Sequence, residues 1–144
     1  FPVPMQWNST KIFSRSFSIL TTFKNMKAFK LFNINGSDSS YEEGTIPELT
    51  NINADYFFIQ TSTGYELSWH PAPRYQFVIT LKGKLKFTVT NGDTFMIEPG
   101  VVLIAKDMEG KGHVWDITDG DEWHRIYIVP NRDADDYFTP MEKT

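Results

Sequence analysis

Apolar and polar residues alternate in short runs from about residue 54 onward, which is the pattern of β-strands. In residues 84–90 (KLKFTVT), Leu85, Phe87 and Val89 fall on one face, and lysines and a threonine fall on the other. Turn residues separate such runs at spacings of roughly 8 to 12 residues. Beyond residue 40, no stretch has the periodicity of a helix longer than two turns. The pattern predicts an all-β sandwich or barrel.

The individual runs predict strands and the turns between them. Strands are expected at residues 26–32, 54–61, 65–69, 75–81, 84–90, 93–97, 101–105, 113–117 and 123–129. Asn91-Gly92 predicts a two-residue type I′ hairpin, because both residue types tolerate positive φ. Pro99-Gly100 predicts a tight turn before a buried strand. Residues 131–144 are expected to form a short helical turn or to lie over the barrel.

Composition narrows the class of protein. The chain has 144 residues, which suits one domain. It has no cysteine, which excludes disulfides and thiolate metal sites and favours a reducing compartment. The longest apolar runs are far shorter than 18 residues, so no membrane span is expected. A net charge of -4 argues against nucleic acid as a partner.

The N-terminal segment differs in charge from the rest of the chain. Residues 1–37 hold five of the 14 basic residues and none of the 18 acidic ones. Residues 1–25 therefore read as a basic extension, and residues 26–144 as the folded domain. The Ser- and Thr-rich, acid-free extension resembles a mitochondrial transit peptide in composition. The segment can also be read as a surface extension. The expected location is the cytoplasm, or the mitochondrion if the segment is a transit peptide.

Two spaced motifs resemble those of the cupin family. The first cupin motif, G-x5-H-x-H-x3,4-E-x6-G, aligns in spacing with Gly64, His70, Ala72, Gln76 and Gly83. The second, G-x5-P-x-G-x2-H-x3-N, aligns with Gly92, Glu98, Gly100, Leu103 and Asp107. All four glycines are present. The resemblance covers about residues 54–130 and implies a cupin-type jelly-roll β-barrel with an N-terminal extension, in a small single-domain cupin.

The resemblance implies a metal site that this sequence does not carry intact. Metal-binding cupins use two histidines and a glutamate of the first motif and a histidine of the second. Those positions here hold His70, Ala72, Gln76 and Leu103, so one imidazole of the usual set is left. Oxygenase activity is therefore not inherited by resemblance alone.

Strand alternation suggests another set of inward side chains. Glu66 shares a face with His70, and His113 shares a face with Trp115. His70, Gln76 and His113 are thus candidate ligands for one divalent ion, such as iron, nickel, zinc or manganese. Without a metal, His70 and Glu66 are candidate acid–base residues, because a histidine titrates near neutral pH.

The same cavity would offer contacts for a substrate. Arg74 is a candidate for binding a carboxylate at the rim, Gln76 for orienting a carbonyl or hydroxyl group, and Trp115 for packing against the ligand. Pro71 and Pro73 stiffen the backbone around these residues. Taken singly, each residue also has an ordinary structural reading.

Two functional classes follow. In the first, the protein is a small enzyme that acts on a small organic molecule inside the barrel, with His70 as acid, base or metal ligand. In the second, it is a non-catalytic module that senses a ligand or serves a structural role as a dimer. A homodimer is expected in either case, formed through strands near the N-terminus such as residues 26–32.

Overall fold

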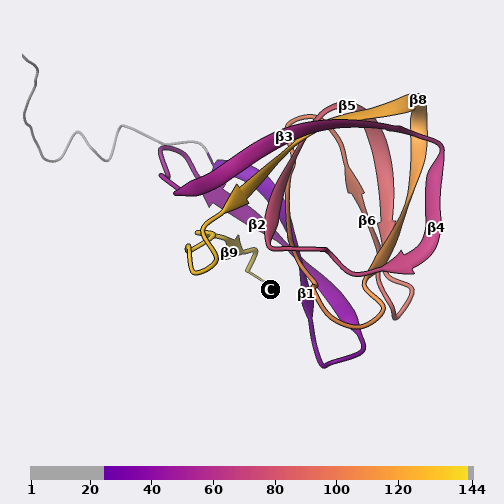
Figure 1. Cartoon of the computed structure of the whole chain (residues 1–144), viewed down its shortest axis with the longest axis horizontal. Coiled ribbons are helices and arrows are strands. Elements are labelled where there is room, and N and C mark those ends of the chain that lie inside the picture. Colours follow the sequence, from indigo (N-terminus) through magenta and orange to yellow (C-terminus); the bar gives the residue numbers. More distant parts are fainter. Residues whose placement is uncertain (1–24, 143–144) are drawn as a thin grey trace, which may run out of the picture.

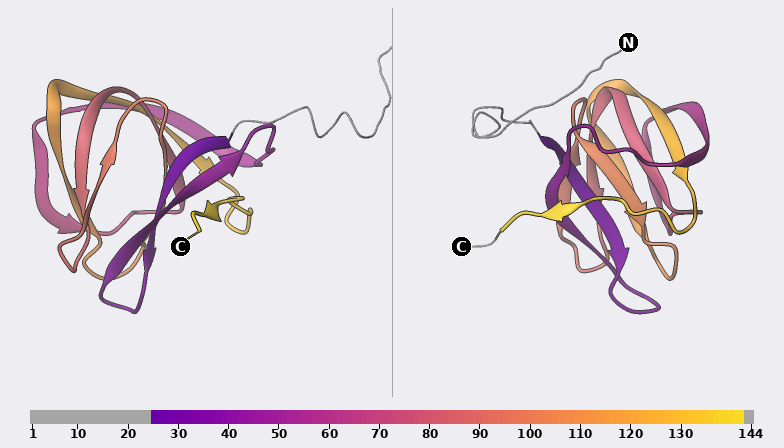
Figure 2. Two further views of the ribbon diagram at one scale, coloured as in Figure 1. Left: turned by 180° about the vertical axis from the view of Figure 1, so that it is seen from behind. Right: turned by 90° about the vertical axis from the view of Figure 1, so that its left-hand side faces the viewer.

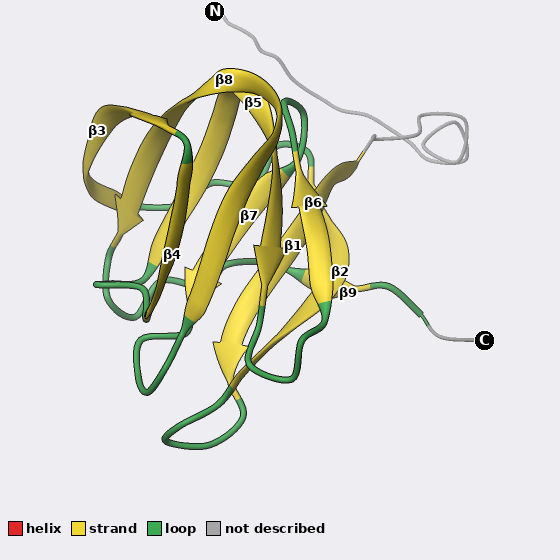
Figure 3. Ribbon diagram, turned by 90° about the vertical axis from the view of Figure 1, so that its right-hand side faces the viewer, coloured by secondary structure: helices red, strands yellow, loops and turns green. Residues whose placement is uncertain are grey.

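Nine strands make up the regular structure of residues 25–142, the part of the chain described in the computed structural model (Figure 1). These strands are β1 (Asn25–Asn33), β2 (Ser39–Pro47), β3 (Ala54–Thr63), β4 (Tyr65–His70), β5 (Gln76–Thr88), β6 (Thr94–Ile97), β7 (Val102–Lys106), β8 (His113–Pro130) and β9 (Thr139–Pro140). No helix occurs among these residues (Figure 3), and so none is long and apolar enough to span a membrane. Apart from Asn25, the predicted basic extension lies outside the described residues.

The strands form one mixed sheet that folds over on itself, so the prediction of an all-β, jelly-roll-like fold is confirmed. The sheet order is β3-β8-β5-β7-β1-β2-β9, with β4 also paired to β8 and β6 to β5. Of the described strand pairs, only β1 and β7 run parallel; the others are antiparallel. β3 and β9 are the two ends of this order and are not paired to each other. The expected barrel is therefore an open, folded sheet in its hydrogen bonding.

β5 and β8 are each one long strand where the sequence predicted two. They pair with each other from Phe77–Ile128 to Thr88–Val114, and the register shifts between Thr80 and Leu85. The sheet turns sharply at this level, as Figure 1 shows where β5 and β8 bend over. The residues between the predicted strands, 82–83 and 118–122, are the residues at which β5 and β8 bend.

Glycines lie at the bend in each of the adjacent chain segments. Gly64 separates β3 from β4, Gly83 lies within β5, and Gly120 lies within β8. All three have positive φ, at 80°, 110° and 91°, which L-residues with side chains adopt only under strain. A Cβ at Gly83 would also come within 2.7 Å of the Glu122 carbonyl oxygen on β8. The glycine row allows three neighbouring strands to turn together.

The sheet is buried on both faces around β1, the first half of β5 and β7. Inside the fold, one apolar cluster contains Leu31, Val78, Phe87, Leu103 and Trp123, among others. On the outer face, a second cluster contains Ala28, Phe77, Val102 and Ile104. Neighbouring residues of β5 and β7 thus enter opposite clusters, which explains the continuous apolar run of β7.

The C-terminal segment covers part of the outer cluster, as the right-hand view of Figure 2 shows for the strand β9 crossing β1 and β2. Phe138 packs against that cluster. Buried Asp136 lies 2.7 Å from Lys30 Nζ and 2.9 Å from Lys106 Nζ. Burial alone would raise the pKa of Asp136, but hydrogen bonds from Lys30, the Phe138 amide and Lys106 outweigh it and lower the pKa. The segment is therefore held over the sheet and does not form the alternative helical turn.

The Asn91-Gly92 turn differs from the predicted type I′ hairpin. Only Gly92 has positive φ, whereas type I′ needs it at both central residues. The Gly92 amide donates to Val89 O, and Asn91 Oδ1 accepts from the Asp93 amide. This side-chain bond favours a longer loop. The Pro99-Gly100 turn is as predicted, since Val101 N donates to Glu98 O and Gly100 has a φ of 95°.

Replacing Gly83 should weaken the bend. We expect Gly83→Ala to lower the free energy of unfolding by about 1 to 3 kcal/mol, because alanine meets both unfavourable φ and the Glu122 carbonyl. Denaturant unfolding measures the change. Gly36→Ala is the control, since its added Cβ would meet only an ordinary contact at 3.9 Å. Equal stability of the two variants would contradict this account of the bend.

Replacing Asp136 should loosen the C-terminal segment in a pH-dependent way. A lowered pKa in the folded state gives stability that is present above the pKa of the unfolded chain, about 4, and lost as pH falls through the folded value. We expect Asp136→Asn to cost about 1 to 3 kcal/mol at pH 7. The difference from the wild type should shrink as pH falls below about 4. Urea unfolding of both proteins at several pH values tests this, and a constant difference would contradict it.

Candidate functional site

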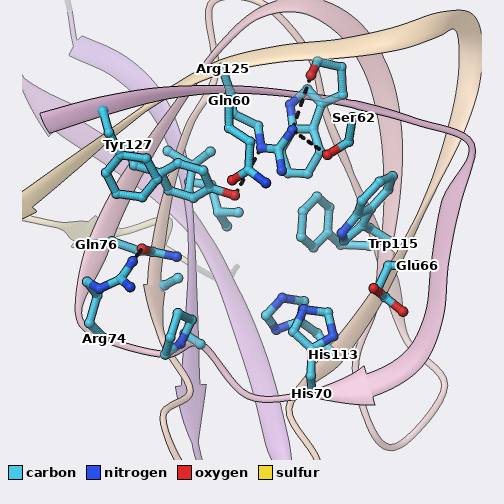
Figure 4. Close-up of a pocket in the computed structure, with 18 residues that line it drawn as sticks. Gln60, Ser62, Glu66, His70, Arg74, Gln76, His113, Trp115, Arg125 and Tyr127 are labelled. Carbon is cyan, nitrogen blue, oxygen red and sulfur yellow. Dashed lines mark hydrogen bonds between the residues drawn. The ribbon is translucent and has the colours of Figure 1, made fainter.

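A cavity of about 370 Å³ lies inside the folded sheet (Figure 4). All six residues that the sequence indicated for a site line it: Glu66, His70, Arg74, Gln76, His113 and Trp115. The four motif positions His70, Ala72, Gln76 and Leu103 line it as well. Motif spacing and strand alternation together thus indicated side chains that line one cavity.

His70 and His113 are neighbours at one end of the cavity. They face each other across the β4–β8 pair, with ring centroids 4.9 Å apart. Gly112 makes this approach feasible, because a Cβ there would collide with the His70 carbonyl oxygen. Its positive φ of 73° also suits glycine. The glycine before His113 thus brings the β7–β8 loop onto the proline corner.

His113 is held by a carboxylate that the sequence analysis did not select. Its Nδ1 donates to Asp107 Oδ2 at 2.6 Å, and both side chains are buried. A neutral imidazole that donates from Nδ1 carries its lone pair on Nε2. Asp107 Oδ1 has no hydrogen-bond partner among the described residues. The Asp107 carbonyl also accepts from the Ala72 amide at 3.0 Å, which ties this pair to the proline corner.

His70 has the same tautomer by a different bond. Its Nδ1 donates to the Ser68 carbonyl oxygen at 2.9 Å, since a carbonyl can only accept. Its Nε2 therefore also carries the lone pair when the ring is neutral. Glu66 lies on the same strand, and its Oε1 accepts from the Ser68 amide at 3.0 Å. The end of the cavity near Trp115 thus contains two imidazoles and one further carboxylate.

Gln76 is oriented by Arg74 at another part of the wall. Arg74 Nη1 donates to Gln76 Oε1 at 3.0 Å. The guanidinium also lies over the Phe58 ring, with its carbon 5.6 Å from the centroid. In Figure 4 the amide nitrogen of Gln76 points into the cavity, with its oxygen turned to Arg74. Gln76 therefore offers hydrogen-bond donors to a ligand.

The predicted metal set of His70, Gln76 and His113 does not bring three free ligand atoms to one point. The Gln76 oxygen, the one ligand atom of that side chain, accepts a hydrogen bond from Arg74, whereas Nε2 of each imidazole stays open. Figure 4 also shows Gln76 and the imidazoles at separate parts of the wall. Across residues 25–142, no cluster of three or more His, Cys, Asp or Glu side chains is placed to hold a metal. The metal set therefore stays a prediction, because side chains that face one cavity need not bring their ligand atoms together.

Arg125 on β8 is a second feature of the cavity that the sequence analysis missed. It is 3% exposed, and its guanidinium carbon lies 3.8 Å from the Trp123 ring centroid. In the predicted strand at 123–129, Ile126 and Ile128 suggest the buried face, which would leave Arg125 outside. The face that carries Ile126 and Ile128 is in fact only half-buried, with Ile59 beside Ile126 68% exposed, and the face that carries Arg125 is the buried one. Trp123, which shares a face with Arg125, was the available signal for an inward arginine.

His124 lies outside the cavity lining. Its Nε2 is 3.1 Å from Glu122 Oε1, on the opposite face from Arg125. Hydrogen bonds from His124 and Lys82 lower the pKa of Glu122. This third histidine of the chain is therefore a natural control for the two in the cavity.

Comparison with known proteins does not place the chain in a family. No family model matches the sequence, and no curated protein matches it either. Among solved structures, the polyketide cyclase RemF from Streptomyces resistomycificus aligns over 92% of this chain and 88% of its own, at 11% identity and a TM-score of 0.33. A TM-score this low carries no argument about fold or function.

Proposed function

We propose that this protein is a degenerate cupin that binds a small organic molecule in its cavity and transfers a proton without a metal. The observation that carries the proposal is the buried Asp107–His113 pair at 2.6 Å, with His113 lining the cavity beside His70. The placement of all four motif positions around one cavity supports the cupin assignment.

His113 is the proposed base. With Nδ1 donating to Asp107, its Nε2 can accept a proton from a carbon next to a substrate carbonyl. The C–H electron pair then forms a double bond to the carbonyl carbon, and the π electron pair of the carbonyl moves onto its oxygen to give an enolate. The resulting imidazolium is stabilised by the negative charge of Asp107, and its proton can return to the same or another atom. Asp107 acts through His113 and is a positioning residue.

Two neighbouring groups complete this proposal. His70 provides a second imidazole next to the base, so a proton can be taken at one atom and delivered at another, as isomerisation and dehydration require. Gln76 donates its amide hydrogens to the carbonyl oxygen. We assign the proton step to the histidines rather than to Glu66, because the Glu66 carboxylate is bonded to the Ser68 amide of its own strand.

Aromatic side chains make up a large part of the remaining cavity wall. Phe87 lies against His113, with ring centroids 5.5 Å apart, and Trp115 and Trp123 also line the cavity. Such a lining takes up the apolar part of an organic ligand, while a few polar groups fix its orientation.

Proton exchange tests the function with model compounds in place of the natural substrate. A panel of small carbonyl compounds is incubated with the protein in D₂O, and loss of the signal of each exchangeable C–H is followed by NMR. We expect His113→Ala to slow exchange about 100-fold or more, the usual contribution of a general base. His124→Ala should leave the rate unchanged. Equal effects of the two substitutions would contradict the assignment.

The positioning role of Asp107 has its own signature. We expect Asp107→Asn to slow exchange by about tenfold or more and to move the His113 proton from Nδ1 to Nε2, since an amide can itself donate. The ¹⁵N shifts of the imidazole report the tautomer. Slowed exchange with an unchanged tautomer would contradict this role. Ligand binding without exchange anywhere in the panel would favour the non-catalytic module instead.

The predicted homodimer requires a different surface from the one expected. β1 pairs with β2 along one edge and with β7 along the other, so it has no free edge for a partner strand. The outer faces of β3 and β4 are instead strongly apolar and exposed, including Phe57 at 67% and Ile59 at 68%. Tyr65, Leu67 and Trp69 continue this face on β4. We propose that a second copy of the chain covers it, because apolar patches of this kind mark association surfaces.

Light scattering tests the dimer. We expect the wild type to have twice the mass of the chain at concentrations well above micromolar, and the double variant Phe57→Glu, Ile59→Glu to have the mass of one chain. Asn51→Glu, in the exposed segment before β3, should remain dimeric. A wild-type monomer would contradict the proposal, as would a double variant that still dimerises.

A further inference from the structure

Arg125 is a buried cation whose contacts in the described part of the chain are all neutral. Its Nε donates to the Tyr127 hydroxyl at 2.9 Å, and its Nη1 donates to Ser62 Oγ and the Trp123 carbonyl, each at 3.1 Å. The guanidinium carbon also lies 5.3 Å from the Tyr127 ring centroid. These contacts fix the group in place, but none of them neutralises its charge.

No carboxylate among residues 25–142 is paired with this charge. The ion pairs of the described residues do not include Arg125. Glu66 is the one acid in the cavity lining, and its Oε1 is bonded to the Ser68 amide. In Figure 4 Glu66 lies beside Trp115, well away from Arg125. A buried charge without a counter-ion is costly, so an anion in the cavity would be strongly favoured.

The guanidinium nitrogen that has no partner among the described residues, Nη2, indicates what kind of anion would bind. Nη2 makes no hydrogen bond with the described residues, while Nε and Nη1 are taken up by the protein. One open guanidinium nitrogen between aromatic rings suits the flat, singly charged carboxylate. A phosphate dianion would call for a cluster of positive groups, and the second arginine of the lining, Arg74, is bonded to Gln76 at another part of the wall.

We propose that Arg125 binds the carboxylate group of the substrate, so that the cavity selects keto acids over neutral ketones. This inference rests on the proposed function for the cavity. Figure 4 shows Arg125 and the two histidines at opposite ends of the space. A carboxylate held by Arg125 therefore places the other end of the ligand near His113. The substrate class is an acid whose exchangeable C–H lies several bonds from its carboxylate.

Matched ligands test the inference on the unaltered protein. Levulinate and benzoylpropionate are compared with their primary amides, which have the same shape and no charge, by calorimetry and by the rise in Tm. We expect each acid to bind about tenfold or more tightly than its amide, as a charge-assisted hydrogen bond contributes. Inorganic phosphate should not compete. Equal binding of acid and amide, no response to any acid, or effective competition by phosphate would overturn the proposal.

Variants then assign the effect to Arg125. Arg125→Gln should remove the preference for acid over amide, and Arg125→Lys should keep part of it because the charge remains. Lys86→Gln removes an exposed positive charge from β5 and should leave the preference unchanged. A folded Arg125→Gln protein that retains the full preference would overturn the assignment. Should that variant not fold, Arg125→Lys and the matched ligands on the wild type still decide.

The two proposals fail in different ways. The same four compounds are followed for C–H exchange in D₂O. Preferential binding of the acids with no exchange would contradict proton transfer and leave the carboxylate site standing. Exchange of the amides as fast as the acids would overturn the carboxylate site and leave proton transfer standing.

Discussion

A sheet can enclose a cavity only if neighbouring strands bend at the same level, and here that bend depends on glycine. Gly64, Gly83 and Gly120 lie in three adjacent segments of the sheet, each with positive φ. At Gly83 the facing backbone is also too close for a side chain. Because β5 and β8 pair with each other on both sides of the bend, the two walls of the cavity are built from the same two strands. The position of Arg125 relative to His113, both on β8, is thereby fixed by that bend.

The polar side chains of the cavity show how its interior tolerates charge. Asp107 and His113 satisfy part of each other's hydrogen-bonding capacity, and Arg74 and Gln76 do the same at another part of the wall. Buried polar groups usually have at least one hydrogen-bond partner. Asp107 Oδ1, behind His113, has none among the described residues, and Arg125 has no counter-ion there. Of these two groups Arg125 lines the cavity, so its charge is the one that a ligand can reach.

The sequence predicted the class of fold and most strand positions, because alternation and turn residues are local signals. It missed β2 (Ser39–Pro47), whose polar, charged residues give little alternation, and it divided β5 and β8 at their bends. It also indicated the six residues that line the cavity, through motif spacing together with strand alternation. It could not find the Asp107–His113 bond, since the loop conformation that joins them is not local to either residue. Arg125 was missed because Ile126 and Ile128 made the other face of β8 look like the interior, although that face is only half-buried.

The hydrogen bond from the Ala72 amide to the Asp107 carbonyl links the rim of the cavity to the carboxylate that holds His113. The stiff corner of Pro71 and Pro73 is thus attached to the residue that orients this imidazole. Ala72 and Asp107 lie more than 30 residues apart in the chain. Two distant loops are in this way joined into one support, so the proline corner sets the position of a histidine that lies far from it in the sequence.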